Sequence, residues 1–431
     1  MPEEYLPSKM PTSSKWVYSV LPESLAAGPL GTLVQLYLIE LNGHTLGTIY
    51  AGLAVALFNG VSIPAAIFWG YATDRLRLRK GLIAGSYALV AAALFILYFE
   101  RSTSDTILLY SAVSFVSAAA ATPLNLLIME TESKPRWADA FARLSMLSSL
   151  GNVGGLIVGF LWAQSLPLIL LSVPLGAFSL ASSVVAFTTI HEPAFIFERQ
   201  TIVGRKQSFF TRLLQLPMMF LNVPRASDFR RIFRGLRYSA TSYMPLFYLS
   251  TIFFYLSSGL FNTSFVPAMS AFSLSEGEVF GVILAGTVVQ TIAFKYLRNF
   301  AGGRSLAGTS VLGLGIRGGC YILIGLLALV LAGPDFMLPS LILYPIAAGI
   351  AFALYYTASN TMMFNNAVGS SPGSALGVYS AVVGFATLAG SLVSGFVSIY
   401  SGFYVTFVLA GMLLFVAAAM LTQIRSMEPM S

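Results

Sequence analysis

Two ionisable side chains, Glu23 and Arg317, lie well inside long apolar segments of the sequence. Ionisable residues in such segments are costly in a membrane and are therefore candidate functional residues. Glu23 follows Pro22 and precedes a Gly28-Pro29 pair that predicts a helix break. A desolvated carboxylate at this position could bind and release a proton, or it could pair with a cationic solute. The alternative is a structural acid near the inner membrane boundary, hydrated from the cytoplasm.

Arg317 stands near the middle of the apolar run 306–332. Its guanidinium could bind an anion or pair with Glu23. It could instead pack against neighbouring helices, either snorkelling towards the membrane surface or held by backbone carbonyl groups.

Motifs for enzyme chemistry are absent from the sequence. There is no Walker loop, no Gly-x-Gly-x-x-Gly after a strand and no His-Glu-x-x-His. A single cysteine, Cys320, excludes a disulfide framework and a thiolate metal site. The two histidines, His44 and His191, fall on opposite sides of the membrane in the predicted topology. We therefore expect no enzyme activity, no cofactor and no metal.

Long apolar runs must position these residues, because the chain is 56% hydrophobic and only 10% charged. Runs of at least about 18 residues match the thickness of a bilayer, and lipid requires each to be a helix with its backbone paired internally. The sequence contains twelve such runs, which are 16–39, 45–69, 81–99, 104–128, 141–163, 167–190, 240–264, 279–297, 306–332, 336–362, 374–398 and 401–423. The fold class expected is therefore an all-α membrane protein.

The positions of lysine and arginine predict the orientation of these runs. With a cytoplasmic N-terminus, cytoplasmic segments hold 22 of the 24 basic residues, and only Arg101 and Arg317 fall elsewhere. Both termini are then cytoplasmic, in a multi-pass protein of the cell membrane. The net charge of +7 reflects this topology, and we expect no nucleic-acid partner.

The runs divide into two sets of six. We expect an N-terminal six-helix half at 1–190, a basic cytoplasmic linker at 191–239 and a C-terminal six-helix half at 240–431. Apolar residues at helical spacing among the linker arginines indicate a short helix on the inner membrane surface. A regulatory or partner-binding role is the alternative for this linker.

The two halves also share a pattern. Residues 154–160 in the fifth run match residues 390–396 in the eleventh, with Gly154, Gly159, Gly390 and Gly395 at corresponding places. Small residues allow close helix packing in lipid, so these segments predict equivalent contacts in an internal repeat.

The connection between the second and third runs, residues 70–80, is a basic hairpin. The twelve runs and this loop together resemble the major facilitator superfamily, over nearly the whole chain. The family's loop reads roughly Gly-x-Leu-Ala-Asp-Arg-x-Gly-Arg-Arg/Lys, and Gly70, Asp74, Arg75 and Arg79 match it, whereas Arg77 stands at the second glycine. The resemblance implies two six-helix halves that rock about a central site in alternating access.

The resemblance also implies a gate. Asp74 and Arg75 would close the cytoplasmic side in the outward-facing state, with Asp74 near the N-terminus of the eleventh span. The arginine would pair with an acid at the cytoplasmic end of the fourth span, for which Glu130 is the first candidate and Glu132 the second. The alternative is that these charges only set the topology.

In the family, spans one, four, seven and ten line the central cavity, which places Glu23 beside it. Span nine is peripheral, which favours a packing role for Arg317. The neutral polar candidates for the lining are Asn59, Asn125, Asn262, Gln290, Tyr355, Tyr356 and Asn360. Each alone could be a helix–helix hydrogen bond. Together they predict a mostly apolar, aromatic cavity for a hydrophobic or weakly polar solute.

We therefore expect a secondary active transporter, specifically a proton-coupled exporter of small hydrophobic or amphipathic compounds, with Glu23 as the proton site. An importer or uniporter of a neutral solute such as a sugar is the first alternative, and a transporter-fold sensor or membrane-embedded enzyme is the second. The expected partners are the solute, protons and the lipid bilayer, and the protein is expected to work as a monomer.

Overall fold

The computed structural model describes residues 14–76, 78–131, 137–190, 244–297, 305–331, 333–367 and 372–427. Every regular element within these ranges is a helix. The first group comprises η1 (Ser14–Ser19), α1 (Val20–Leu76), α2 (Arg79–Phe99), α3 (Thr103–Thr131), α4 (Trp137–Trp162), η3 (Leu168–Leu171) and α5 (Ser172–Thr189). The second comprises α9 (Met244–Ala271), α10 (Glu276–Leu297), α11 (Leu306–Val330), η5 (Gly333–Phe336), α12 (Met337–Tyr344), η6 (Pro345–Ala351), α13 (Phe352–Ala367), α14 (Pro372–Ser401) and α15 (Phe403–Met427).

Ten helical segments in these ranges are long and apolar enough to cross a membrane. The first of them, Trp16–Gly70, contains two predicted runs, which are separated where Gly43 adopts a φ of 72°. This left-handed backbone favours glycine because it has no Cβ. The helix α9, with 28 residues, corresponds to the predicted run 240–264, so each of the twelve predicted runs has a helical counterpart in the described ranges. The protein is a multi-pass membrane protein.

Three predicted boundaries are wrong. The hairpin 70–80 is mostly helical, because α1 continues to Leu76 and α2 begins at Arg79. The run 240–264 corresponds to α9, which ends seven residues later, at Ala271. The predicted break at Gly28-Pro29 is absent, since α1 passes through Pro29 as a continuous helix. Gly28 instead allows α4 to approach, with the Asn152 backbone oxygen 2.6 Å from the place of a Cβ.

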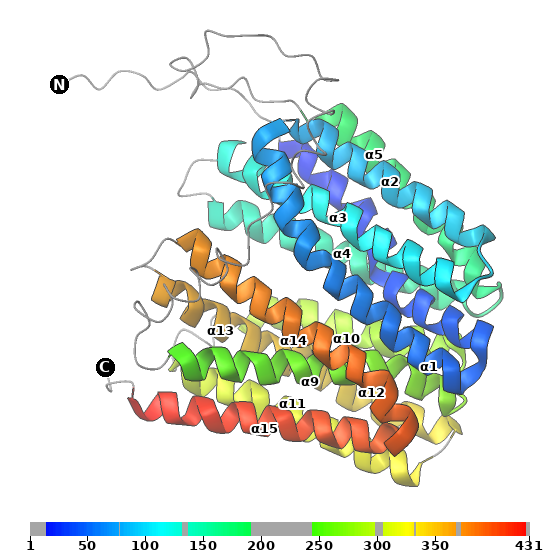
Figure 1. Ribbon diagram of the computed structural model, residues 1–431, viewed down its shortest axis with the longest axis vertical. Coiled ribbons are helices and arrows are strands. Elements are labelled where there is room, and N and C mark those ends of the chain that lie inside the picture. Colours follow the sequence, from blue (N-terminus) through cyan, green and yellow to red (C-terminus); the bar gives the residue numbers. More distant parts are fainter. Residues whose placement is uncertain are drawn as a thin grey trace.

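The two groups of helices lie side by side. In Figure 1, α1–α5 form the upper group and α9–α15 the lower group, and they meet mainly where α1 packs against α14 and α9, and α10 against α4. The predicted linker, 191–239, lies within residues 191–243, which are outside the described residues. Its boundaries with the two halves therefore stay a prediction.

The matching glycines of the repeat make matching contacts inside each group. A Cβ at Gly154 would lie 2.8 Å from Leu25 of α1, and one at Gly390 would collide with the Leu256 carbonyl of α9. The α1–α4 and α9–α14 pairs are thus close-packed in the same way, as expected where small residues bring helices together in lipid.

The second glycine of each segment lies between the two groups. Gly159 of α4 meets the Phe280 ring of α10, and Gly395 of α14 meets the backbone of Ile49 in α1. Both contacts lie towards the end of the molecule at which α1 turns at Gly43, which we name the Gly43 end. The repeat therefore gives two corresponding contacts between the groups at this end, which we name the seams.

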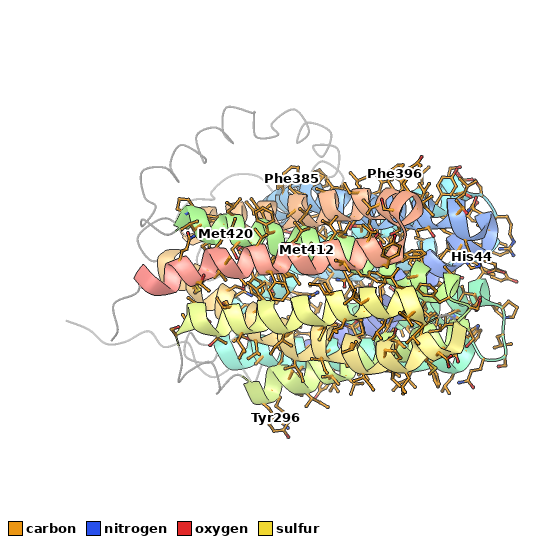
Figure 2. The ribbon with its side chains drawn as sticks, turned by 90° about the horizontal axis from the view of Figure 1, so that it is seen from below. His44, Tyr296, Phe385, Phe396, Met412 and Met420 are labelled. Carbon is orange, nitrogen blue, oxygen red and sulfur yellow. The ribbon has the colours of Figure 1, made fainter. Side chains whose placement is uncertain are left out.

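The outer surface of the bundle is apolar. Figure 2 shows Tyr296, Phe385, Phe396 and Met412 projecting from the helices, and all four are exposed. His44 lies at one end of the molecule, near Gly43. Large exposed apolar side chains around helices whose own backbones are paired are the surface expected in contact with lipid.

One segment of the tenth span departs from α-helical geometry. The seven residues of η6, Pro345–Ala351, form a π-helix between α12 and α13. Gly349 in this segment meets Val289 and the backbone of Gln290 in α10. Segments of π-helix occur frequently at functional sites, and this one directly precedes Phe352, Tyr355 and Tyr356.

Candidate functional site

Glu23 faces the interior of the N-terminal group. Its Oε2 accepts a hydrogen bond from the Ser179 hydroxyl of α5 at 2.6 Å, and the same hydroxyl lies 2.9 Å from the Tyr87 carbonyl oxygen of α2. No basic side chain of the described ranges forms an ion pair with Glu23. The carboxylate therefore lies at the meeting point of α1, α2 and α5, with one hydroxyl as its polar partner.

Ser179 offers one hydrogen to two acceptors. When Glu23 is ionised, the hydroxyl stabilises the charge by donating to Oε2. When Glu23 is protonated, the hydroxyl is released to donate to the Tyr87 carbonyl and can accept from the carboxylic acid. In the protonated state the acid, the hydroxyl and the Tyr87 carbonyl oxygen are therefore all paired, and on ionisation Ser179 moves its hydrogen bond from that carbonyl to the carboxylate.

Ser179→Ala is expected to move the pH dependence of any Glu23-linked transport to higher pH, because the ionised carboxylate loses its donor. The measurement is solute flux in reconstituted vesicles over a pH series. Ser183→Ala is the matched control, since this neighbouring α5 hydroxyl donates to the Ala84 carbonyl of α2 at 2.7 Å and does not contact Glu23. Equal pH profiles for the two variants would contradict the role given to Ser179.

Arg317 is enclosed by aromatic rings in the second group. Its side chain is only 2% exposed, and its Nε donates to the Tyr321 hydroxyl at 2.8 Å. The guanidinium carbon lies 5.0 Å from the ring centroid of Phe254 in α9 and 5.2 Å from that of Phe352 in α13. These are cation–π distances, so rings rather than carbonyl groups hold the charge. Glu23 is not among its contacts.

Tyrosines from three helices gather beside this arginine. The Tyr355 ring of α13 stacks on Phe254 with centroids 3.8 Å apart. The hydroxyls of Tyr255 in α9 and Tyr379 in α14 interact electrostatically with those of Tyr355 and Tyr356. We name Tyr255, Tyr355, Tyr356 and Tyr379 the tyrosine cluster.

The sequence predicted Tyr355 and Tyr356 of the tyrosine cluster as site residues, but not Tyr255 or Tyr379. It also missed Ser179. Each of these three lies in a different span from its partner, and neither spacing nor a motif marks it in the sequence. Only the pairing of helices brings them together.

Solved structures of other proteins share the arrangement of helices described above. No protein-family model matches the chain, and no curated protein matches its sequence. A crystal structure of the nucleoside transporter NupG matches with a TM-score of 0.71 at 14% identity, covering 96% of this chain and 99% of that one. The chain has the major facilitator fold. This confirms the fold predicted from the sequence.

Two further structures show the same fold. A mutant of the peptide transporter POT in complex with sulfate has a TM-score of 0.70 at 12% identity, covering 96% of this chain and 94% of that one. The human organic anion transporter MFSD10 (TETRAN) has a TM-score of 0.60 at 16% identity, covering 96% of this chain and all of that one. At such identities the likeness concerns the arrangement of helices.

The structure describes only part of the gate predicted from the sequence. Gly70 lies within α1 with open space around it, and Arg79 is the buried first residue of α2. The backbones of Asp74 and Arg75 belong to α1, and that of Glu130 belongs to α3. The side chains of these three residues, and the whole of Glu132, lie outside the described residues, so the gate stays a prediction.

The remaining polar candidates are dispersed over the major facilitator fold. Asn125 in α3 and Asn262 in α9 are exposed, whereas Asn59 in α1 and Gln290 in α10 are half-buried. No hydrogen bond within the described ranges joins these four side chains. Asn360 donates to the Tyr356 carbonyl of its own helix at 2.9 Å. Of the predicted lining residues, the structure brings only Tyr355, Tyr356 and Asn360 into one region.

Proposed function

We propose that this protein is a secondary active transporter that moves a small solute by alternating access. The major facilitator fold over nearly the whole chain is the observation that carries this proposal. The similar structures are those of transporters, named for nucleosides, peptides and organic anions. A fold hosts many functions, so the substrate must be argued from the side chains.

The solute we propose is a small hydrophobic or amphipathic compound, exported in exchange for protons. Aromatic rings around Tyr355 and Tyr356 support an apolar solute, and the half-buried Glu23 carboxylate with its Ser179 partner supports the proton. The seams at Gly159 and Gly395 support alternating access, because glycine lets helices of the two groups pack closely there. In the predicted topology this end is extracellular, and the protein lies in the cell membrane with both termini cytoplasmic.

The transport proposal is tested with purified protein in sealed vesicles. The probes are p-toluenesulfonate and benzyltrimethylammonium, which carry permanent charges and cross lipid slowly, and glucose as a neutral solute. Vesicles with an acidic lumen are expected to accumulate an aromatic probe as protons leave, and to lose it when the gradient is collapsed. Accumulation of glucose alone, without dependence on the gradient, would favour the uniporter alternative. Absence of flux for all probes in protein that binds one of them would contradict transport.

A further inference from the structure

The positive charge of Arg317 has no counter-charge in its own group of helices. Between residues 244 and 427 the only acidic residues are Glu276, Glu278 and Asp335. The first two begin α10 and the third lies in η5, beyond the end of α11. The part of α11 that follows Arg317 alone spans about 20 Å at the rise of an α-helix. None of these acids forms an ion pair with Arg317 in the described part of the chain.

The hydrogen bonds of Arg317 are incomplete as well. Its Nε is satisfied by Tyr321, whereas its buried Nη1 has no hydrogen-bond partner among the described residues. Aromatic faces offset part of the cost of this burial. A buried cation without an anion is nevertheless costly, and such residues mark the paths of ions and ligands in membrane proteins.

The charge of Arg317 acts on the tyrosine cluster. Phe254 contacts both groups, the guanidinium by cation–π geometry and Tyr355 by stacking. The Tyr355 hydroxyl lies within electrostatic range of both Arg317 and Tyr379. Side chains in contact therefore run from Arg317 of α11 through Phe254 of α9 to Tyr355 of α13.

Two hydroxyls of the tyrosine cluster are buried without a hydrogen bond of good geometry in the described part of the chain. Tyr355 and Tyr379 are 1% and 6% exposed, and no group in the described ranges meets hydrogen-bond geometry with either hydroxyl. The polar groups around Tyr355 are the hydroxyls of Thr251, Ser359 and Tyr379. Thr251 and Ser359 donate to backbone carbonyls, so towards the phenols they can act only as neutral acceptors, and neither lies in hydrogen-bond geometry. Two phenol donors beside a positive charge, with no carboxylate nearby, favour an anion as the missing acceptor.

We propose that the tyrosine cluster binds the anionic group of an aromatic solute, a carboxylate or sulfonate, with Arg317 supplying the compensating charge from beside Phe254. Tyr355 and Tyr379 donate hydrogen bonds to the anion. Tyr356, which is 41% exposed, offers its ring to the aromatic part of the solute. This inference rests on the proposed transport function and deepens it by naming the substrate class.

The site is tested by binding, measured as thermal stabilisation of the purified protein over a concentration series. The probes are p-toluenesulfonate and its neutral counterpart p-toluenesulfonamide. The sulfonate is expected to stabilise the wild type and the sulfonamide to have little effect. Tyr379→Phe should weaken sulfonate binding about tenfold, the loss expected for one hydrogen bond to a charged group. Arg317→Gln should abolish the preference for the sulfonate.

Tyr110→Phe is the matched control, because this buried tyrosine stacks on Phe58 in the other group of helices. It should bind the sulfonate as the wild type does. If Arg317→Gln does not fold, Tyr355→Phe and Tyr379→Phe decide the question. Equal stabilisation by both probes, or an unchanged sulfonate affinity in these tyrosine variants, would overturn the site. Sulfonate binding without flux would contradict the proposed transport function but not this site. Flux that does not depend on the charge of the probe would contradict this site but not the transport function.

Discussion

Vesicles that contain the Glu23→Gln variant are expected to lose solute accumulation driven by a pH gradient while still exchanging solute for solute. Glutamine has nearly the size of glutamate, and its side-chain oxygen can still accept the hydrogen bond from Ser179. It cannot bind or release a proton, so only the coupling should fail. Among the acidic side chains that the structure describes, Glu23 is the one that does not lie near the Gly43 end of the molecule.

The measurement compares gradient-driven accumulation with counterflow in the same vesicles. Glu278→Gln is the control, because Glu278 is an exposed acid that accepts hydrogen bonds from the backbone and side chain of Ser275. That variant should keep its response to the gradient. If Glu23→Gln keeps it too, the carboxylate is a structural acid and the proton enters elsewhere.

Gly28→Ala is expected to destabilise the protein strongly, because the added methyl group has no room between α1 and α4. The new Cβ would lie 2.6 Å from the backbone oxygen of Asn152 and 2.8 Å from its Cα. Backbone atoms cannot rotate away, so α1 and α4 must separate. Overpacking typically costs about 1–3 kcal/mol, and a collision with backbone atoms should reach at least the upper end of that range.

Gly259→Ala should behave in the same way in the second group, since its Cβ would lie 2.5 Å from the Thr387 backbone oxygen of α14. Gly85→Ala and Gly319→Ala are the controls, because nothing lies within 4 Å of a Cβ at either position. Alanine in an open helical position is neutral or stabilises by up to about 1 kcal/mol. Thermal unfolding of the four purified variants separates the two classes, and melting of Gly28→Ala at or above wild type would refute the close packing.

The helices could be predicted from the sequence because lipid leaves the backbone no alternative. An apolar run of sufficient length must pair its own N–H and C=O groups, so length and composition decide the secondary structure. The predicted end of α9 was wrong, and the packing of this helix gives the reason. Thr263 and Ser264 interrupt the apolar pattern, yet both are buried and bond to serines of α14. Polar side chains that face a neighbouring helix look like a helix end in the sequence.

The partners of the candidate site residues could not be predicted from the sequence. Ser179 lies 156 residues from Glu23, and Tyr379 lies in a different helix from Tyr355. Such pairs depend on which faces of two helices meet. The resemblance to a family gave the order of helices around a cavity, but it gave neither the inward direction of Glu23 towards α2 and α5 nor the rings around Arg317.

The π-helix at Pro345–Ala351 changes the phase of the tenth span. A π-turn holds one residue more than an α-turn, and each residue of an α-helix advances the direction of its side chain by about 100°. All side chains after Ala351 therefore point in directions different from those of an uninterrupted helix that begins at Met337. Phe352 meets Arg317, and Tyr355 meets Phe254, because of this rotation. The tenth span is thus two helices of different phase on one axis, the first directed to lipid and α10 and the second to the tyrosine cluster.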